Sequence, residues 1–294
     1  MTRLLAVSDL HVRHPDNRVV ADRLRPTGED DWLIVAGDVA EQVDDVLGQL
    51  ERLRGRFARV LWVPGNHELW TRTKEQPALR GVARYDRLVA GCRALGVDTP
   101  EDPWPVFPDV DGPVTVALLF LLYDYSFLPE GATGAEDGLD VARRAGVVCT
   151  DEHLLHPDPH PSRAAWSAAR VAATRARLDA LDGPTVLVNH WPLTRLPTRV
   201  LRHPEFALWC GTTASADWHV RYRARAVVHG HLHIPRTLVE DGVPFHEVSL
   251  GYPREWRARD ERFGTTTPDL LPRAVLGPGP ALHPPADPPA RPRP

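Results

Sequence analysis

The chain lacks a long apolar run, has three cysteines and contains a single lysine. Its most apolar stretch, Val114 to Leu122, is far shorter than the roughly 20 residues that a membrane-spanning helix needs. Cys92, Cys149 and Cys210 are widely spaced and form no CxxC pair, which argues against a disulfide framework and favours a reducing compartment. A strand begins close to the N-terminus and leaves no room for a signal peptide. We therefore expect a cytoplasmic protein that does not enter the membrane.

The composition also lacks an excess of positive charge. Lys and Arg number 35 against 39 Asp and Glu, which gives a formal net charge of -4. Binding to nucleic acid relies on Lys and Arg that neutralise phosphates, so this balance argues against a nucleic-acid partner. Hydrophobic residues make up 43% of the 294 residues, which is enough for a substantial core in one large domain or two small ones.

Aliphatic runs that are typical of buried strands recur along the chain, and a polar block follows each of them. The runs are Leu4 to Val7, Trp32 to Ala36, Val60 to Val63, Thr185 to Val188 and Ala226 to Val228. The blocks are Asp9-Leu10-His11, Gly37-Asp38, Gly65-Asn66-His67-Glu68, Asn189-His190 and Gly230-His231-Leu232-His233. Because the carboxyl ends of parallel strands meet at one edge of a sheet, we expect an α/β fold that gathers these polar side chains.

The rest of the chain is read from its periodicity and its turn residues. Apolar spacing predicts helices over residues 41–57, 82–95 and 162–181, the last with Ser162 as its N-cap. Asp241-Gly242 between two apolar runs predicts a β-hairpin. Residues 126–161 form a long insertion, typical of a lid or a binding loop. We predict one domain over residues 1–263 and a proline-rich, disordered tail over residues 264–294.

The polar blocks contain the side chains that bind metals in proteins. A single DxH, or a single histidine after a strand, is usually structural, but five such blocks in this order are hard to obtain by chance. Oxygen and imidazole donors suit a pair of hard or borderline ions, and we expect manganese, iron or an Fe³⁺/Mn²⁺ pair. The candidate metal ligands are Asp9, His11, Asp38, Asn66, His190, His231 and His233. The pattern indicates a binuclear metal hydrolase.

In their order, the blocks resemble the calcineurin-like metallophosphoesterase superfamily, whose pattern is DxH, GDxx(D/E), GNH(D/E), H and GHxH. The resemblance covers roughly residues 1 to 260. It implies a four-layer α/β sandwich, in which two mixed β-sheets pack face to face and are flanked by helices. The ligand sets that it implies are Asp9, His11, Asp38 and His233 for one ion, and Asp38, Asn66, His190 and His231 for the other.

The same resemblance implies a mechanism. A hydroxide that bridges the two ions attacks phosphorus, and the ions stabilise the in-line displacement. His67 is the candidate general acid for the leaving alkoxide, and Glu41 is at the position that orients this histidine and raises its pKa. Glu41 has a simpler interpretation as an acidic residue at a helix start, where the helix dipole favours it. Glu68 has the same alternative.

Two branches of the superfamily do not fit this chain. Serine/threonine phosphatases carry an arginine after the second block, where this chain has Gln42, and purple acid phosphatases use a tyrosine ligand at the position of Glu41. The stretches over residues 120–131, 205–213, 216–219 and 251–256 are instead similar to the bacterial phosphopantetheinyl hydrolase subfamily. That similarity implies removal of 4'-phosphopantetheine from holo-acyl carrier protein.

Candidate substrate contacts come from these stretches. Tyr123, Tyr125, Trp209 and Trp218 would form an aromatic wall for the pantetheine arm, and Arg254 would contact phosphate or an acidic carrier helix. The alternative for each is ordinary, as a packed aromatic ring or as a solvated surface charge. Two other functions stay open. One is a phosphodiesterase for a cyclic nucleotide or another small phosphoester, and the other is a non-catalytic scaffold, which would need a broken set of ligands.

Overall fold

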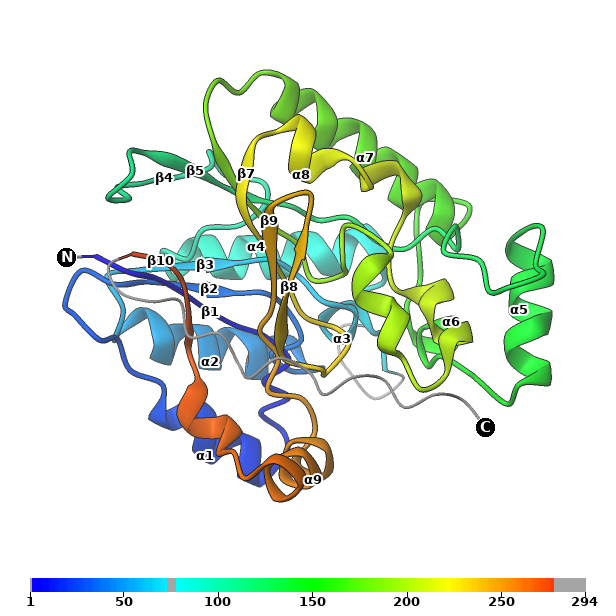
Figure 1. The fold of residues 1–294 in the computed structure, drawn as a ribbon, viewed down its shortest axis with the longest axis horizontal. Coiled ribbons are helices and arrows are strands. Elements are labelled where there is room, and N and C mark those ends of the chain that lie inside the picture. The colour runs from blue at the N-terminus through cyan, green and yellow to red at the C-terminus, as the bar shows by residue number, and fades with distance from the viewer. Residues whose placement is uncertain (1, 73–77, 278–294) are drawn as a thin grey trace.

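Two β-sheets lie face to face in the middle of the molecule, and helices cover their outer faces (Figure 1). The computed structural model describes residues 2–72 and 78–277. Leu4 and Ile34 from one sheet and Val186 and Val228 from the other are fully buried in the core between the two sheets. This arrangement confirms the four-layer α/β sandwich.

The first sheet has four strands in the order β10-β1-β2-β3. Their bounds are β1 Leu4–Val7, β2 Trp32–Val35, β3 Arg59–Trp62 and β10 Arg273–Leu276. β1, β2 and β3 are parallel, and Trp32 is in register with both Leu4 and Arg59. Their carboxyl ends therefore meet at one edge of the sheet, as the sequence predicted.

The second sheet has six strands in the order β4-β5-β6-β7-β9-β8. Their bounds are β4 Val106–Phe107, β5 Val114–Leu118, β6 Thr185–Val188, β7 Ala224–His229, β8 Arg236–Glu240 and β9 Val243–Glu247. β5, β6, β7 and β9 are parallel, whereas β4 and β8 are antiparallel to their neighbours. The turn between β8 and β9 is at Asp241-Gly242, both with positive φ, so the predicted hairpin is confirmed.

Three long helices form at the predicted positions and pack on the outer faces of the sheets. The helices are α1 Pro15–Arg23, α2 Val43–Arg54, α3 Asn66–Leu69, α4 Gly81–Ala94, α5 Ala135–Arg144, α6 Asp151–Leu154, α7 Arg163–Asp179, α8 Trp218–Arg221 and α9 Pro253–Phe263. Within residues 2–72 and 78–277 there are also four 3-10 helices: η1 Leu196–Val200, η2 Pro204–Trp209, η3 Thr213–Ser215 and η4 Thr267–Leu270. α2 and α4 bury Leu50 and Leu88 against the first sheet, and α7 buries Leu178 against the second. Ser162 caps α7 by accepting the backbone N–H of Ala165.

The predicted disordered tail is wrong for its first part. η4 and β10 lie within residues 264–277, and Arg273 and Val275 of β10 are buried. Composition misled the prediction because the unpaired edge of β1 supplies the hydrogen bonds that order this short strand. The domain therefore continues past the predicted boundary at residue 263. Residues 278–294 of the predicted tail lie outside the described residues.

The predicted insertion over residues 126–161 contains α5 and α6. Ala142 and Leu155 are fully buried in the same core as the first sheet, and Asp151 is also fully buried. This stretch is therefore packed against the domain at both helices. Whether part of it acts as a lid stays a prediction.

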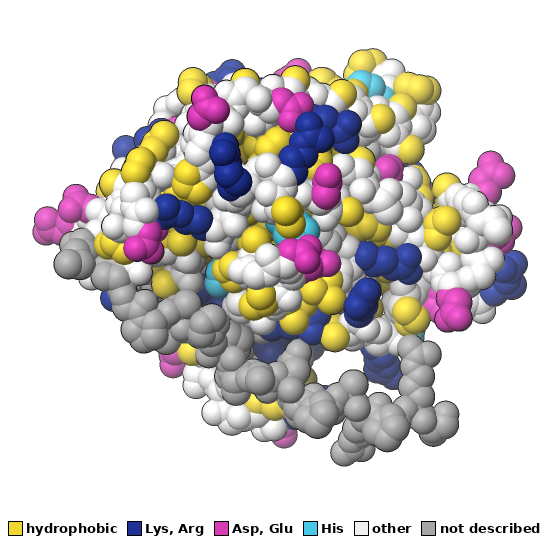
Figure 2. All heavy atoms as spheres, turned by 45° about the horizontal axis from the view of Figure 1, so that its top comes forward, with side chains coloured by type: hydrophobic (Ala, Val, Ile, Leu, Met, Phe, Trp, Pro, Cys, Tyr) yellow, Lys and Arg dark blue, Asp and Glu magenta, His cyan; other side chains and the backbone are white. Residues whose placement is uncertain are grey.

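On the surface, basic and acidic side chains are interspersed. Figure 2 shows this mixture on one face, with hydrophobic atoms scattered between the charges. No described helix is both long and apolar enough to cross a membrane. The absence of a nucleic-acid partner remains a prediction.

Candidate metal centre

Six of the seven candidate ligands lie in the loops that directly follow β1, β2, β6 and β7, and Asn66 is the first residue of α3, which follows β3. Five of them have a positive φ: Asp9 (52°), His11 (41°), Asp38 (55°), His231 (73°) and His233 (56°). A residue with a side chain rarely adopts this left-handed backbone, and such strain clusters at functional sites. Bends immediately after the strands turn the side chains of both sheets toward a common centre.

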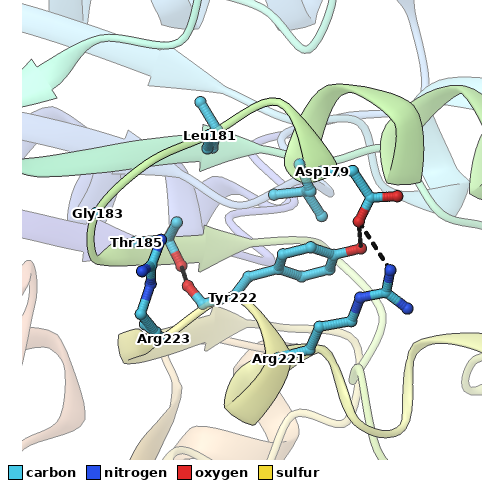
Figure 3. A pocket seen from close by; sticks show the side chains of 8 residues that line it. Asp179, Leu181, Gly183, Thr185, Arg221, Tyr222 and Arg223 are labelled. Carbon is cyan, nitrogen blue, oxygen red and sulfur yellow. Dashed lines mark hydrogen bonds and ion pairs between the residues drawn. The ribbon is translucent and has the colours of Figure 1, made fainter.

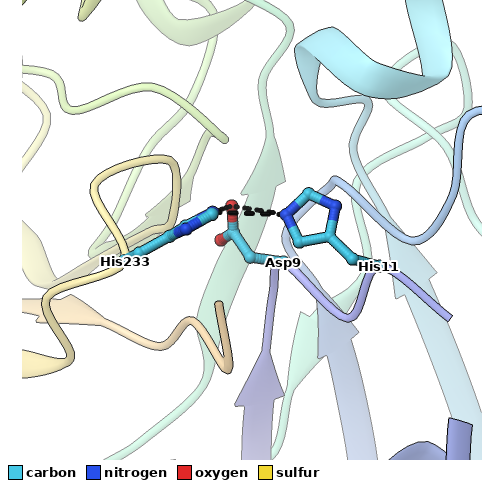
Figure 4. A group of neighbouring side chains, drawn as sticks. All are labelled: Asp9, His11 and His233. Carbon is cyan, nitrogen blue, oxygen red and sulfur yellow. Dashed lines mark hydrogen bonds and ion pairs between the residues drawn. The ribbon is translucent and has the colours of Figure 1, made fainter. Parts of the chain in front are cut away.

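The first group consists of Asp9, His11 and His233 (Figure 4). Nε2 of His233 lies 3.0 Å from Oδ1 of Asp9, and Nε2 of His11 lies 4.0 Å from the same oxygen. The two Nε2 atoms are 3.2 Å apart. Three donor atoms from β1 and β7 thus converge on one point, as the pattern DxH and GHxH predicted.

The second group consists of Asp38, Asn66, His190 and His231. Nε2 of His190 lies 3.5 Å from Oδ2 of Asp38 and 3.2 Å from Oδ1 of Asn66. Nδ1 of His231 also lies 3.2 Å from Oδ1 of Asn66. Asp9, Asp38 and His190 have ligand atoms within 4.8 Å of one another, so the two groups adjoin.

Hydrogen bonds on the far side of the rings decide which nitrogen faces the centre. Nδ1 of His190 is 2.8 Å from the carbonyl of Ala36, and Nδ1 of His233 is 2.7 Å from Oε2 of Glu255. Both partners accept, so each Nδ1 donates and each Nε2 of a neutral ring directs a lone pair inward. In the neutral state the lone pair of His190 would meet the lone pairs of Asn66 Oδ1. A cation between them removes that repulsion, and the donor set fits metal ions.

The charges in the centre also favour cations. Burial lowers the pKa of His190, but the carboxylates of Asp38 and Asp9 outweigh it and raise the pKa to about 10. Burial lowers the pKa of His233 as well, and Asp9 and Glu255 raise it to about 10. Without another cation, protons on these two rings balance the buried carboxylates. Metal ions would supply the same balance.

His67 and Glu41 meet at the edge of the two groups. Nδ1 of His67 lies 3.5 Å from Oε1 of Glu41, and Nε2 lies 3.8 Å from Oδ2 of Asp38. The adjacent imidazole of His67, together with neighbouring positive charge, lowers the pKa of Glu41 to about 2 against the effect of burial. The indole ring of Trp70 packs on the imidazole with ring centroids 3.6 Å apart. These contacts match the predicted orienting role of Glu41, which stays a proposal.

Glu68 is a buried support for the loop that carries Asp38. Its carboxylate accepts the backbone N–H groups of Asp38, Val39 and Gly65, at 2.8 to 2.9 Å. Burial and the charge of Asp38 raise the pKa of this carboxyl to about 7. In the sequence, only its position directly after His67 indicates a role for Glu68 in the site. The sequence is equally compatible with an ordinary acidic residue at a helix start.

Tyr252 and Glu255 are neighbours of the centre that the sequence analysis did not select. Tyr252 stacks on His11, with ring centroids 4.6 Å apart, and its hydroxyl lies 3.3 Å from Nε2 of His67. Glu255 receives the hydrogen bond from His233 described above. Both residues belong to the stretch 251–256, whose similarity to the phosphopantetheinyl hydrolase subfamily is the sequence signal that points to them. Arg254 itself is exposed on α9, and its role stays a prediction.

The predicted aromatic wall is contradicted for Tyr123 and Trp218. Neither side chain has any exposed surface, because Tyr123 packs among Tyr125 and Trp191, and Trp218 belongs to the core beneath the second sheet. Aromatic residues in a sequence are drawn to the core as strongly as to a binding site.

Tyr125 and Trp209 are also buried, and both donate to Oε1 of Glu152 in the 126–161 insertion. A substrate role for these two residues stays a prediction. In the described structure they join the insertion to the segment that follows β5 and to η2.

A separate cavity of about 190 Å³ opens near the starts of β6 and β7, away from the candidate ligands (Figure 3). Its lining includes Asp179, Arg221 and Tyr222. Arg221 and the hydroxyl of Tyr222 both bond to Oδ1 of Asp179, at 2.9 and 2.8 Å. The polar groups thus satisfy one another, and we assign no chemistry to this cavity.

Comparisons with known proteins agree with this geometry. The chain is 59% identical over 258 residues to the [acyl-carrier-protein] phosphodiesterase PptH of Mycobacterium tuberculosis strain H37Rv. The aligned residues cover 87% of this chain and 80% of that protein. The crystal structure of phosphopantetheinyl hydrolase (PptH) from M. tuberculosis has a TM-score of 0.86 and 58% identity, over 88% of this chain and 92% of that one. The sequence model of the calcineurin-like phosphoesterases matches residues 2–235. The chain is therefore a member of the calcineurin-like phosphoesterase family.

Proposed function

We propose that this enzyme hydrolyses the phosphodiester bond that joins 4'-phosphopantetheine to the serine of holo-acyl carrier protein. The assignment of this substrate rests on the 59% identity to a phosphodiesterase of acyl carrier protein, over 87% of this chain. The convergence of seven metal-binding side chains supports the reaction. A cytoplasmic location would follow from this substrate.

The two groups of side chains would hold two ions. Asp9, His11 and His233 would hold one, Asn66, His190 and His231 would hold the other, and Asp38 would contribute to both. Bound ions of this kind activate water and neutralise the charge that develops on a phosphoryl group. Nitrogen and oxygen donors suit both manganese and iron, so we propose Mn²⁺, Fe or an Fe³⁺/Mn²⁺ pair.

Residues of this chain supply the proton that the leaving group needs. Cleavage at the carrier serine leaves an alkoxide, which needs a proton, whereas the phosphate stays on pantetheine. Oε1 of Glu41 lies 3.5 Å from Nδ1 of His67, and the other ring nitrogen, Nε2, faces Asp38 at 3.8 Å and the metal centre. A positioned donor of this kind speeds the step by about 10²–10⁴-fold. His67 is the proposed general acid, and Glu41 keeps it protonated and oriented.

The test is intact-protein mass spectrometry of a purified holo-acyl carrier protein incubated with the metal-loaded enzyme. The expected result is conversion to the apo form with release of 4'-phosphopantetheine. Asp38→Asn, which weakens both ion sites, and a chelated sample serve as controls and should leave the holo form intact. If the holo form persists while a cyclic nucleotide is cleaved efficiently, the proposed substrate is wrong and the alternative phosphodiesterase takes its place.

A further inference from the structure

The amide group of Asn66 is held from the side that faces away from the candidate ligands. Its Nδ2 donates to Oδ1 of Asp151 at 2.9 Å, and its Oδ1 lies 3.2 Å from both His190 and His231. An amide has one end that donates and one end that accepts. The bond to Asp151 therefore determines that the oxygen, and not the NH₂ group, faces the metal centre.

The same oxygen of Asp151 has a second partner. Nε1 of Trp70 donates to it at 2.7 Å, and the ring of Trp70 packs against His67. Asp151 is fully buried, and its other oxygen, Oδ2, has no hydrogen-bond partner. A buried carboxylate is costly, and this one has both of its described donors on one atom. Its bonds are thus directed to a candidate ligand and to the residue that supports the candidate acid.

The backbone around Asp151 is anchored from both sides. The guanidinium of Arg163 donates to the carbonyl oxygens of Asp151 and Leu155, at 2.7 and 2.8 Å. The N–H of Thr71, just after α3, donates to the carbonyl of Leu154 at 2.9 Å. Asp151 therefore cannot move away from Asn66 without breaking several bonds. The insertion over residues 126–161 supplies this support, although it contributes none of the seven ligands.

We propose that Asp151 is a positioning residue of the metal centre, which turns the amide oxygen of Asn66 toward the second ion and holds Trp70 against His67. With the amide reversed, two N–H groups would face the ion and one ligand would be lost. The inference rests on the metal centre of the proposed function but does not depend on the carrier-protein substrate.

Two substitutions separate positioning from simple packing. Asp151→Leu has a similar size and no acceptor, whereas Asp151→Asn can still present an oxygen to Asn66 and Trp70. For Asp151→Leu we expect one ion to bind as in the wild type and the second to bind about 10–100-fold more weakly, the usual effect of losing a partner of a metal ligand. Asp151→Asn should restore the second ion. Metal titration followed by calorimetry, and metal content after dialysis, are the readouts.

Asp31 is a matched control. It is also a buried carboxylate, which accepts backbone N–H groups of Arg3, Thr27 and Gly28, but it precedes β2 whereas Asp38 follows that strand. Asp31→Leu should lower the thermal midpoint and leave both ions bound. Equal loss of the second ion in Asp31→Leu and Asp151→Leu would show a general loss of stability and overturn the inference.

A double-mutant cycle with Asn66→Ala tests whether Asp151 affects binding of the second ion through Asn66. If Asp151 acts through Asn66, then Asp151→Leu weakens the second ion no further once Asn66 is alanine; an additive loss would overturn the proposal. If Asp151→Leu does not fold, Asp151→Ala replaces it, and retention of both ions at wild-type affinity would then refute the role. A second ion that depends on Asp151, in an enzyme that leaves holo-carrier protein intact, would reject the proposed substrate and keep this inference.

Discussion

The imidazole of His67 is surrounded by groups that stabilise its protonated form. Burial lowers its pKa, but the carboxylates of Asp38 and Glu41 outweigh burial and raise the pKa above its ordinary value. Trp70 limits rotation of the ring, since the two ring centroids are 3.6 Å apart. A ring held in this way keeps its proton and presents it in one direction.

At this residue we predict a large loss of rate without loss of metal. His67→Ala should retain both ions and lose about 10²–10⁴-fold in kcat on holo-acyl carrier protein, because the leaving serine alkoxide depends on its proton. The loss should be much smaller for an aryl phosphodiester, whose leaving group needs little protonation. Rates on both substrates, with metal content determined in parallel, provide the measurement. Equal losses on the two substrates would remove His67 from the acid role.

Tyr252 tests a single hydroxyl beside the same histidine. Tyr252→Phe keeps the ring that stacks on His11 and removes the oxygen 3.3 Å from Nε2 of His67. One hydrogen bond contributes about 0.5–1.5 kcal/mol, so kcat should fall about 2–12-fold. Tyr252→Ala should do more damage, because it also removes the stacked ring. A Phe variant with wild-type kcat would show that only the ring matters.

At the scale of single elements, short strands do most of the positioning. β1, β2, β3 and β6 have four residues each, and the polar blocks begin within three residues of their ends. Strands of this length have little stability on their own and depend on pairing with their neighbours in the sheets. β10 is the element through which the C-terminal part of the chain joins this framework.

We predict that β10 contributes measurably to stability. A chain that ends at Gly277 keeps the strand, whereas a chain that ends at Phe263 exposes the edge of β1 and the core beneath Val275. Burial of one valine contributes about 1.5–3 kcal/mol, so the shorter chain should lose at least about 1.5 kcal/mol of unfolding free energy. Urea titrations of both chains provide the comparison. Coincident unfolding curves would mean that the strand adds nothing.

For the whole molecule, the buried charges of the metal centre link metal binding to stability. Asp9 and Asp38 are buried next to several histidines, and removal of the ions leaves protons as the remaining balance. Chelation should abolish turnover and lower the thermal midpoint, and added Mn²⁺ should restore both. A ligand at 100 times its Kd stabilises the folded state by about 2.7 kcal/mol. Calorimetry with and without chelator measures the change in the thermal midpoint. An unchanged midpoint would contradict tight binding of metal by the folded chain.

Prediction from the sequence succeeded where the signal is local. Aliphatic runs followed by polar residues located the ends of β1 and β6 to the residue, and Ser162 was recognised as the cap of α7. It failed for Trp218, because an aromatic residue near a site and one in the core look the same in a sequence. It also failed for β10, whose order comes from the edge of a strand far away along the chain.

The order of residues alone predicts the seven donor side chains and their positions after strands, because each polar block is contiguous. Parallel strands then place their carboxyl ends, and so these blocks, at one edge of the sheet. Which nitrogen of His190 faces inward, and which end of Asn66 faces the centre, depends on Ala36 and Asp151. Asn66 and Asp151 are 85 residues apart, and His67 and Tyr252 are 185 apart. Contacts over such separations leave no periodic trace in the sequence, since only the packing of the two sheets and the insertion creates them.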